Sequence, residues 1–181
     1  MEHTFFKIIK QLIFYTVLFV IFVFTQLNAS STNDKHTILS KNIKIVDGDT
    51  IKLDGIKIRF SGIDAPESYY KGYSQKCFIN KKEVNCGQLS KDFLINLVGS
   101  NIVSCKLEKK PDQYNRKLGE CFLQNQSISR ILVKNGYAFD YSKYSKRKYA
   151  EDQKYAKSKK LGLWDMEFEF PWDFRARLRK N

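Results

Sequence analysis

Apolar and polar residues alternate through three short runs between residues 42 and 60, and this pattern constrains the fold more than any other feature of the chain. Asp47-Gly48-Asp49 separates the first run from the second, and Asp54-Gly55 separates the second from the third. Alternation with a period of two is typical of strands that bury one face, and Asp-Gly is a strong signal for a two-residue hairpin turn. The sequence therefore predicts three consecutive antiparallel strands in a meander.

The third run of this meander determines which side chains leave the core. Ile56, Ile58 and Phe60 share one face of the strand. Lys57 and Arg59 must then point to the other face, because successive side chains of a strand alternate. Arg59 is therefore expected at the rim of the sheet, close to the end of its strand.

Helical and strand patterns continue after the meander. Apolar residues recur at helical spacing over 89–98, and two alternating runs at 102–107 and 118–123 predict a long hairpin. A helix is expected over 127–136, and a basic helix over 144–160. This order predicts an α+β fold that is mainly β: a small five-stranded barrel with three helices.

The N-terminal segment 1–29 has the organisation of an export signal. Lys7 and Lys10 precede an apolar run over 12–24, and small residues follow it. Residues 8–27 are alternatively retained as a membrane anchor, although the run is short for a span of roughly 20 residues. In both interpretations the domain is exported. It is periplasmic or secreted if the signal is cleaved, and otherwise it is anchored to the membrane outside the cytoplasm.

The four cysteines fit an oxidising compartment. Cys105 and Cys121 are expected on facing strands of the long hairpin, and Cys77 and Cys86 close a short loop ahead of the first helix. Three pairings are open from the sequence, and these two disulfides are preferred. A zinc site has little support, since no C-x-x-C pair occurs and the chain has 2 histidines.

The chain has a formal net charge of +13. Only Glu2, Lys7 and Lys10 carry full charges within residues 1–29, so nearly all of the surplus belongs to the rest of the chain. A surplus of this size favours a polyanionic partner such as nucleic acid, an acidic membrane surface or an acidic polysaccharide. The alternative is a basic protein kept soluble by its charge.

Two polar stretches, Val46–Thr50 and Arg59–Glu67, flank the predicted strands. Each alone is usually a turn or a loop. Together they place Asp49 at the start of the second strand, and Asp64 and Glu67 just past the end of the third. Three converging carboxylates repel one another unless a cation lies between them, and oxygen ligands without histidine or thiolate suit calcium or magnesium.

The run from Val46 to Glu67 resembles the active-site strands of the staphylococcal nuclease (thermonuclease) family. Asp112–Arg116 resembles that family's loop with a second catalytic arginine, Gly136–Ala138 the end of its second helix, and Gly162–Trp164 its closing segment. The resemblance extends over about residues 42–164. It implies an OB-type five-stranded barrel with three helices.

The resemblance also implies a calcium-dependent endonuclease that acts on DNA and/or RNA and leaves 3′-phosphate ends. Asp49 and Asp64 resemble its calcium ligands, and Ala65 would offer a backbone carbonyl. Glu67 resembles the general base or water-positioning residue.

Arg59 and Arg116 resemble the pair that grips the phosphate in this family. Tyr114 resembles a tyrosine that contacts a substrate phosphate, and Tyr141 is a candidate for base stacking by loose similarity of position. Asn115 stands where the family usually has glycine, and asparagine tolerates the left-handed backbone that such a turn needs.

These patterns together predict a polar linker at 30–41, a nuclease domain at 42–165 and a basic aromatic tail at 166–181. The tail either packs its aromatic residues back on the barrel or adds phosphate contacts, and packing is favoured for Trp172. No obligate protein partner is evident.

Two other functions compete with an exported nuclease. One is a non-catalytic nucleic-acid-binding OB-type module tethered at the membrane. The other is a membrane-tethered structural or adhesion protein that uses its basic surface. The set of Arg59, Glu67 and Arg116 argues against both, because pure binding has no use for carboxylates beside a phosphate.

Overall fold

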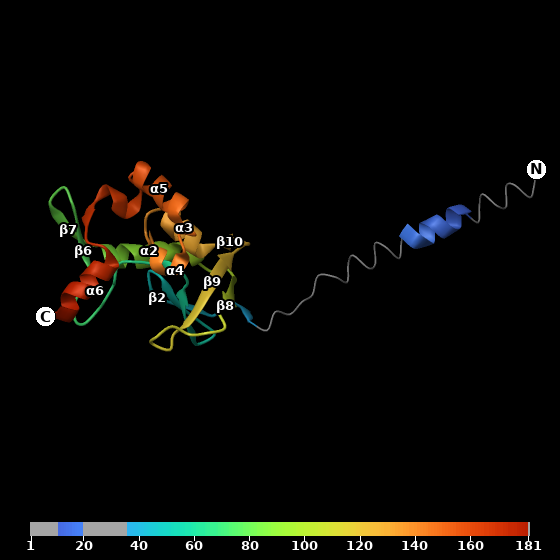
Figure 1. Ribbon diagram of the computed structural model, residues 1–181, viewed down its shortest axis with the longest axis horizontal. Helices are drawn as coiled ribbons and strands as arrows, with labels where there is room; N and C mark the ends of the chain where they lie inside the picture. Colours follow the sequence, from blue (N-terminus) through green and yellow to red (C-terminus); the bar gives the residue numbers. More distant parts are fainter. Residues whose placement is uncertain (1–10, 20–35, 181) are drawn as a thin grey trace, which may run out of the picture. The chain divides into compact units, whose positions relative to one another are not determined.

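The computed structural model describes residues 11–19 and 36–180 (Figure 1). The chain divides into two units, residues 1–35 and 36–181. In the first unit, residues 11–19 form a helix with exposed side chains. The rest of the segment 1–29, with its export signal or anchor, lies outside the described residues. Within 11–19 and 36–180, no helix has the length and hydropathy that crossing a membrane would require.

The predicted meander is confirmed. Its strands are β2 (Ile43–Asp47), β3 (Thr50–Leu53) and β4 (Ile56–Phe60), with β3 between the other two and both pairings antiparallel. Asp54 and Gly55 turn the chain between β3 and β4 with φ of 48° and 81°. Positive φ at both positions is what a type I′ hairpin turn requires.

The meander belongs to a larger sheet. β8 (Val103–Leu107) and β9 (Lys117–Leu123) form the predicted long hairpin, and β9 runs parallel to β4. The strand order is β1-β8-β9-β4-β3-β2, where β1 is Thr37–Ser40, with the short β10 (Gln126–Ser127) beside β9. The α+β class with a sheet-rich core is confirmed, but no ladder among the described strands joins β1 to β2 into a closed five-stranded barrel.

Ile56 differs from its predicted burial. Ile58 and Phe60 are fully buried, whereas Ile56 is 38% exposed. The parallel pairing with β9 begins only at Ile58, so the first residues of β4 extend beyond the cover of that strand.

The expectation of a linker at 30–41 is wrong for its last part. Thr37–Ser40 form β1, which pairs antiparallel with β8, from Thr37 opposite Lys106 to Ser40 opposite Val103. The segment is short and mostly polar, so its alternation is weak in the sequence. Its place at the edge of the sheet depends on the unpaired backbone groups of β8, a tertiary cause that local composition does not reveal.

Two helices agree with their predicted positions. α2 (Cys86–Val98) ends at Gly99, whose N–H donates to the carbonyl of Ile95 at 2.9 Å. α3 (Ile128–Lys134) begins after Ser127, whose hydroxyl accepts from the N–H of Arg130. These ends follow the usual rules for a glycine stop and a serine N-cap.

The single helix predicted over 144–160 is wrong. The chain forms α4 (Ser142–Ser145) and α5 (Ala150–Ser158) instead. Lys146 and Arg147 between them have φ of 53° and 65°, in the left-handed region that interrupts a helix. Side-chain packing supplies a reason for the break, because the following Tyr149 is almost fully buried.

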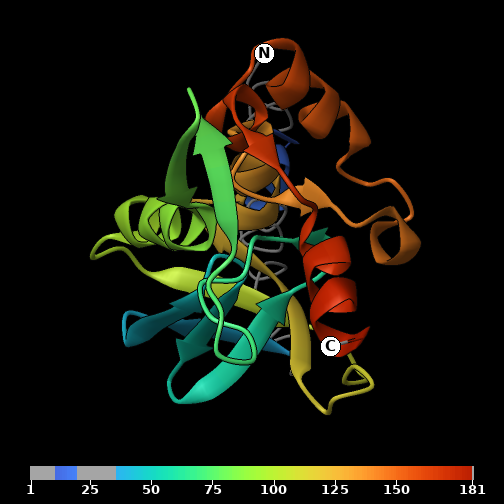
Figure 2. The ribbon, with the colours of Figure 1, turned by 90° about the vertical axis from the view of Figure 1, so that its left-hand side faces the viewer.

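The tail is part of the folded unit. β12 (Glu167–Phe168) pairs with β6 (Lys76–Ile79), which also pairs with β7 (Lys82–Asn85). After β12 the chain forms α6 (Pro171–Lys180), drawn in red in Figures 1 and 2. Remaining short elements are β5 (Ile63–Asp64) paired with β11 (Phe139–Asp140), and the 3-10 helix η2 (Gly162–Asp165).

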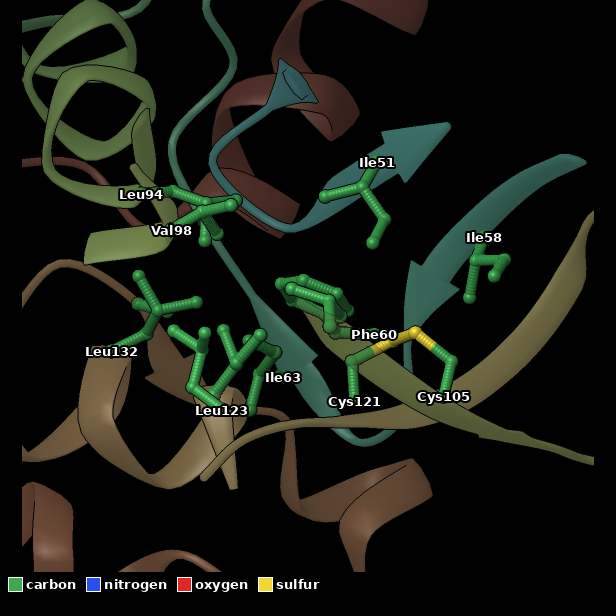
Figure 3. Packing of buried hydrophobic residues seen from close by; sticks show 14 of the residues in the cluster. Ile51, Ile58, Phe60, Ile63, Leu94, Val98, Cys105, Cys121, Leu123 and Leu132 are labelled. Carbon is green, nitrogen blue, oxygen red and sulfur yellow. A yellow bond between two sulfur atoms is a disulfide. The ribbon is translucent and has the colours of Figure 1, made fainter. Parts of the chain in front are cut away.

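Two apolar clusters stabilise this arrangement. The larger fills the space between the main sheet, α2 and α3, and contains the Cys105–Cys121 disulfide (Figure 3). The smaller surrounds Phe139 and includes the Cys77–Cys86 disulfide. Both preferred cysteine pairings are thus confirmed. Trp172 packs as expected, with its ring stacked on Phe170 at 4.6 Å between centroids.

Candidate active site

The turn between β2 and β3 places Asp49. Gly48 lies so close to α2 and to the segment after β5 that an added Cβ would stand 2.8 Å from Cβ of Ser90 and 2.9 Å from Cβ of Ala65. Real Cβ atoms do not approach so closely, so only glycine allows this turn to pack there. Asp49, next in sequence, is thereby held against the end of β4.

Arg59 joins the first two carboxylates. Its Nη1 lies 2.7 Å from Asp49, and its Nη2 lies 2.5 Å from Oδ1 of Asp64. Asp49 also accepts from the hydroxyl of Thr50 at 2.7 Å and from the N–H of Ala65 at 3.2 Å. Both aspartates are buried, and burying such charges requires paired, hydrogen-bonded partners.

Backbone contacts hold Glu67 beside them. Its N–H donates to Oε1 of Gln75 at 3.1 Å, and the buried amide of Gln75 donates to the carbonyl of Glu169 at 2.6 Å. The first turn of α2 presses on the same backbone, since a Cβ on Gly87 would lie 2.0 Å from the carbonyl oxygen of Glu67. Glu67 is therefore positioned by three separate elements.

A second guanidinium, from Arg175 in α6, completes the cluster. Its Nη2 donates to Oδ2 of Asp64 at 2.6 Å, and its Nη1 donates to Oε1 of Glu67 at 2.6 Å and to Oδ1 of Asp64 at 3.0 Å. The side chain of Arg175 is only 16% exposed. We call Asp49, Asp64, Glu67, Arg59 and Arg175 the carboxylate–arginine cluster.

Burial and like charge shift the pKa values within the cluster. Burial, with Asp49 as a second cause, raises the pKa of Glu67 from 4.5 to about 7, while Arg175 acts in the opposite direction. Burial also raises the pKa of Asp64 against the effect of Arg175 and Arg59. A carboxylate whose pKa lies near neutrality is suited to proton transfer at physiological pH.

The neighbouring Asp47 was not assigned a role from the sequence. Its Oδ1 accepts from the N–H groups of Gly48 at 2.9 Å and Ser68 at 3.2 Å. Burial and the charge of Asp49 raise its pKa. This carboxylate ties the β2–β3 turn to the segment after Glu67, which brings the two polar stretches together.

Arg116 and Tyr114 lie in a different place, on the loop between β8 and β9. Arg116 pairs with Asp112 at 2.6 Å in its own loop and lies over the ring of Tyr114, 5.4 Å from the centroid. Tyr114 is 63% exposed. Asn115 has φ of 58°, the left-handed conformation anticipated for it. The structure therefore gathers Asp49, Arg59, Asp64 and Glu67. Arg116 is paired with Asp112 instead, on a separate loop.

Tyr141 follows β11, the strand that pairs with β5. Its N–H donates to the carbonyl of Gly62 at 3.0 Å. One face of its ring stacks on Trp172, with 5.3 Å between centroids and an interplanar angle of 9°. The ring of Tyr144 also contacts Tyr141, with 4.9 Å between centroids and an interplanar angle of 63°. Two aromatic neighbours therefore already pack against the ring of Tyr141.

The oxygen atoms of the carboxylates can be compared with the ligands that a divalent cation prefers. Asp49, Asp64 and Glu67 offer only oxygen atoms, which suit a hard ion such as calcium. Within the described part of the chain, no group of three or more acidic, histidine or cysteine side chains has already converged as a metal site. The two arginines stand between the carboxylates instead. The chemistry of the residues fits calcium, with Asp49, Asp64 and the Ala65 carbonyl as the atoms that would hold it.

Sequence reasoning missed Arg175 and Gln75. A signal for Arg175 was present, because Pro171, Phe174 and Leu178 recur at helical spacing and predict a helix with one buried face. The face on which Arg175 lies, and its proximity to Asp64, depend on how that helix docks. Gln75 lies in a loop and gave no pattern at all.

Comparisons with known proteins agree with this geometry. The family model described as staphylococcal nuclease homologue matches residues 57–166. A protein named uncharacterized endonuclease from Haemophilus influenzae is 35% identical over 151 residues, which span 80% of this chain and 75% of that protein. Micrococcal nuclease of Shigella flexneri is 32% identical over 156 residues, covering 77% of this chain and 80% of its own length.

A third relative is much longer than this chain. Endonuclease YhcR of Bacillus subtilis is 32% identical over 151 residues, which cover 74% of this chain but 12% of that protein. The similarity is therefore to one part of a larger protein in that case and to most of the length in the other two. A family model that matches more than half of the chain, together with these relatives, shows that the chain belongs to the staphylococcal nuclease family.

Proposed function

We propose that this chain is a nuclease that hydrolyses phosphodiester bonds of DNA and/or RNA. One observation carries the proposal: Asp49 and Asp64 hold the guanidinium of Arg59, and Arg175 joins Glu67 to Asp64, in a chain of a family whose relatives are named nucleases. A buried group of carboxylates beside an arginine suits phosphate chemistry and has no evident use in a module that only binds nucleic acid. The formal net charge of +13 is in keeping with a polyanionic substrate.

The roles of the residues follow from their positions. Arg59 lies between Asp49 and Asp64 and would donate to the oxygens of a substrate phosphate as negative charge builds up on them. Glu67, with its pKa of about 7, would orient a water molecule and accept its proton. Arg116 and Tyr114 sit on an exposed loop, from which they would reach the same phosphate. Tyr141 is the candidate for stacking on a base.

Calcium is the cofactor that we propose, held by Asp49, Asp64 and the carbonyl of Ala65. When bound, it would neutralise charge on the phosphate and polarise it. Cleavage that leaves 3′-phosphate ends is part of the same proposal. The domain would work outside the cytoplasm, and both disulfides support an oxidising environment.

A hydrolysis assay on the whole chain tests these statements. We expect cleavage of DNA or RNA in millimolar calcium, its loss with chelator, and products with 3′-phosphate ends. Glu67→Gln should lower kcat by about 10²-fold or more, a typical contribution of a general base.

Glu83→Gln is the matched control, because Glu83 is an exposed carboxylate that pairs with Lys76 on β6, away from the cluster. Activity should survive that change. Full turnover by Glu67→Gln would contradict the role of Glu67. Substrate binding by the unmodified chain, without any hydrolysis, would favour the alternative of a binding module.

A further inference from the structure

We propose that Arg175 is a built-in counter-ion that occupies the cation position of the active site, so that a divalent ion must displace its guanidinium before the site can work. This inference rests on the proposed function, because it concerns the regulation of the same site. It assigns to α6 an autoinhibitory role at Asp64 and Glu67.

The geometry of Arg175 is that of a bound cation. Three donations from its two Nη atoms reach one oxygen of Glu67 and both oxygens of Asp64. Asp64 is fully buried and Glu67 is partly buried, so water is largely excluded from the contact. A planar guanidinium that bridges two carboxylates in this way makes the strongest kind of side-chain hydrogen bonds.

Charge also favours exchange with a divalent ion. Asp49, Asp64 and Glu67 carry three negative charges when ionised, against two positive charges on Arg59 and Arg175. The guanidinium stays protonated throughout the physiological range, so it leaves the cluster by competition and not by losing a proton. A doubly charged ion held by Asp64 would repel Arg175 and would supply the positive charge that Arg175 supplies without it.

The helix does not depend on this contact for its position. Phe174 and Leu178 bury their side chains under α6, and Nζ of Lys71 donates to the carbonyl of Leu178 at 3.3 Å. Trp172, near its start, stacks on Tyr141. Arg175 is therefore presented by a helix that is docked through other residues. Figure 2 shows α6 in red near the C-terminus, and only the side chain of Arg175 needs to withdraw.

Calcium binding without substrate tests the proposal, by isothermal titration calorimetry on the whole chain at constant ionic strength. Arg175→Gln removes the charge and should bind calcium about tenfold more tightly than the unmodified chain, because a partly buried charge at contact distance is worth at least that factor. Arg177→Gln is the matched control. Arg177 lies on the same helix, is more exposed and pairs with Glu169 at 2.8 Å, away from the cluster.

The outcomes are distinct. Tighter binding by Arg175→Gln and unchanged binding by Arg177→Gln support the counter-ion. Equal affinity of the unmodified chain and Arg175→Gln, or an equal gain in both variants, overturns it and leaves the proposed nuclease standing. Absence of calcium binding in every form overturns the inference together with the proposed cofactor.

Circular dichroism would reveal whether Arg175→Gln folds. If it does not fold, a second variant tests the proposal. Arg175→Lys keeps the positive charge but cannot bridge both carboxylates with a planar fork. It should bind calcium more tightly than the unmodified chain, by a smaller factor than the glutamine variant. Affinity equal to that of the unmodified chain would overturn the proposal on this variant too.

Discussion

At the residue scale, the two arginines predicted for phosphate binding are held in different ways. Arg59 is fixed between Asp49 and Asp64, and these partners outweigh the effect of burial and hold its pKa above the ordinary value. Arg116 pairs with Asp112 within its own exposed loop. A donor fixed in advance costs no reorganisation when charge develops, so Arg59 should contribute more to the transition state than to binding.

Lysine at position 59 tests this expectation. Arg59→Lys should lower kcat by about 10²–10³-fold with a smaller change in substrate affinity, because a point charge cannot replace the planar fork. Arg116→Lys should also lower kcat more than affinity, provided that its loop delivers it to the phosphate. Steady-state kinetics and equilibrium binding give both numbers. Unchanged turnover in both variants would remove the catalytic assignment.

The pKa of Glu67 predicts how stability depends on pH in the cation-free protein. The folded-state pKa of about 7 lies above the ordinary 4.5, so between these values the folded chain keeps a proton that the unfolded chain has lost. This contribution to stability is complete below about pH 4.5 and is lost as the pH rises through about 7.

Urea denaturation in chelator over about pH 5 to 8 measures the effect. Glu67→Gln has no such proton, so its free energy of unfolding should fall less steeply over this interval than that of the unmodified chain. Parallel curves for the two proteins would show that burial does not raise the pKa of Glu67.

At the scale of elements, α2 positions the site through its first turn. Gly87→Ala would push a methyl group into the carbonyl of Glu67, 2.0 Å away, and backbone atoms cannot rotate aside. We expect a loss of about 1–3 kcal/mol in the free energy of unfolding, with a drop in kcat from the displaced carboxylate.

Ser90→Ala on the same helix is the control for Gly87→Ala. Its buried hydroxyl has no hydrogen-bond partner in the described structure, so its removal should leave stability unchanged or raise it. Equal kcat for Gly87→Ala and the unmodified chain would show that α2 does not position Glu67.

Secondary-structure elements could be predicted from the sequence where a local sequence pattern agrees with the contacts made in the folded chain. The Asp54-Gly55 turn, the Ser127 cap and the Gly99 stop each follow from a rule that operates within a few residues. β1 and the break between α4 and α5 could not be predicted in this way, because they depend on the edge of β8 and the burial of Tyr149.

The same distinction applies to the site. Asp49, Arg59, Asp64 and Glu67 were found because they lie at the ends of strands whose pairing was readable, and strand pairing brings such ends together. Arg175 is 111 residues from Asp64 along the chain, and its contact requires α6 to dock correctly. No local rule gives that docking.

At the scale of the whole molecule, the positive charge predicts salt-dependent substrate capture. Each phosphate contact with lysine or arginine releases a counter-ion from nucleic acid, so affinity falls as salt increases. KM should rise steeply with salt, whereas kcat should change little because the cluster is partly buried. Kinetics at several sodium chloride concentrations check this prediction, and a KM independent of salt would contradict it.

The Cys77–Cys86 disulfide has a consequence for when the molecule matures. It bonds β6 to the first residue of α2, and the next residue, Gly87, presses on the backbone of Glu67. A chain surrounded by cellular thiols lacks this covalent brace and should hold Glu67 less firmly. On the proposal of an exported nuclease, full assembly of the site would follow export, which would spare the nucleic acids of the cell that makes it.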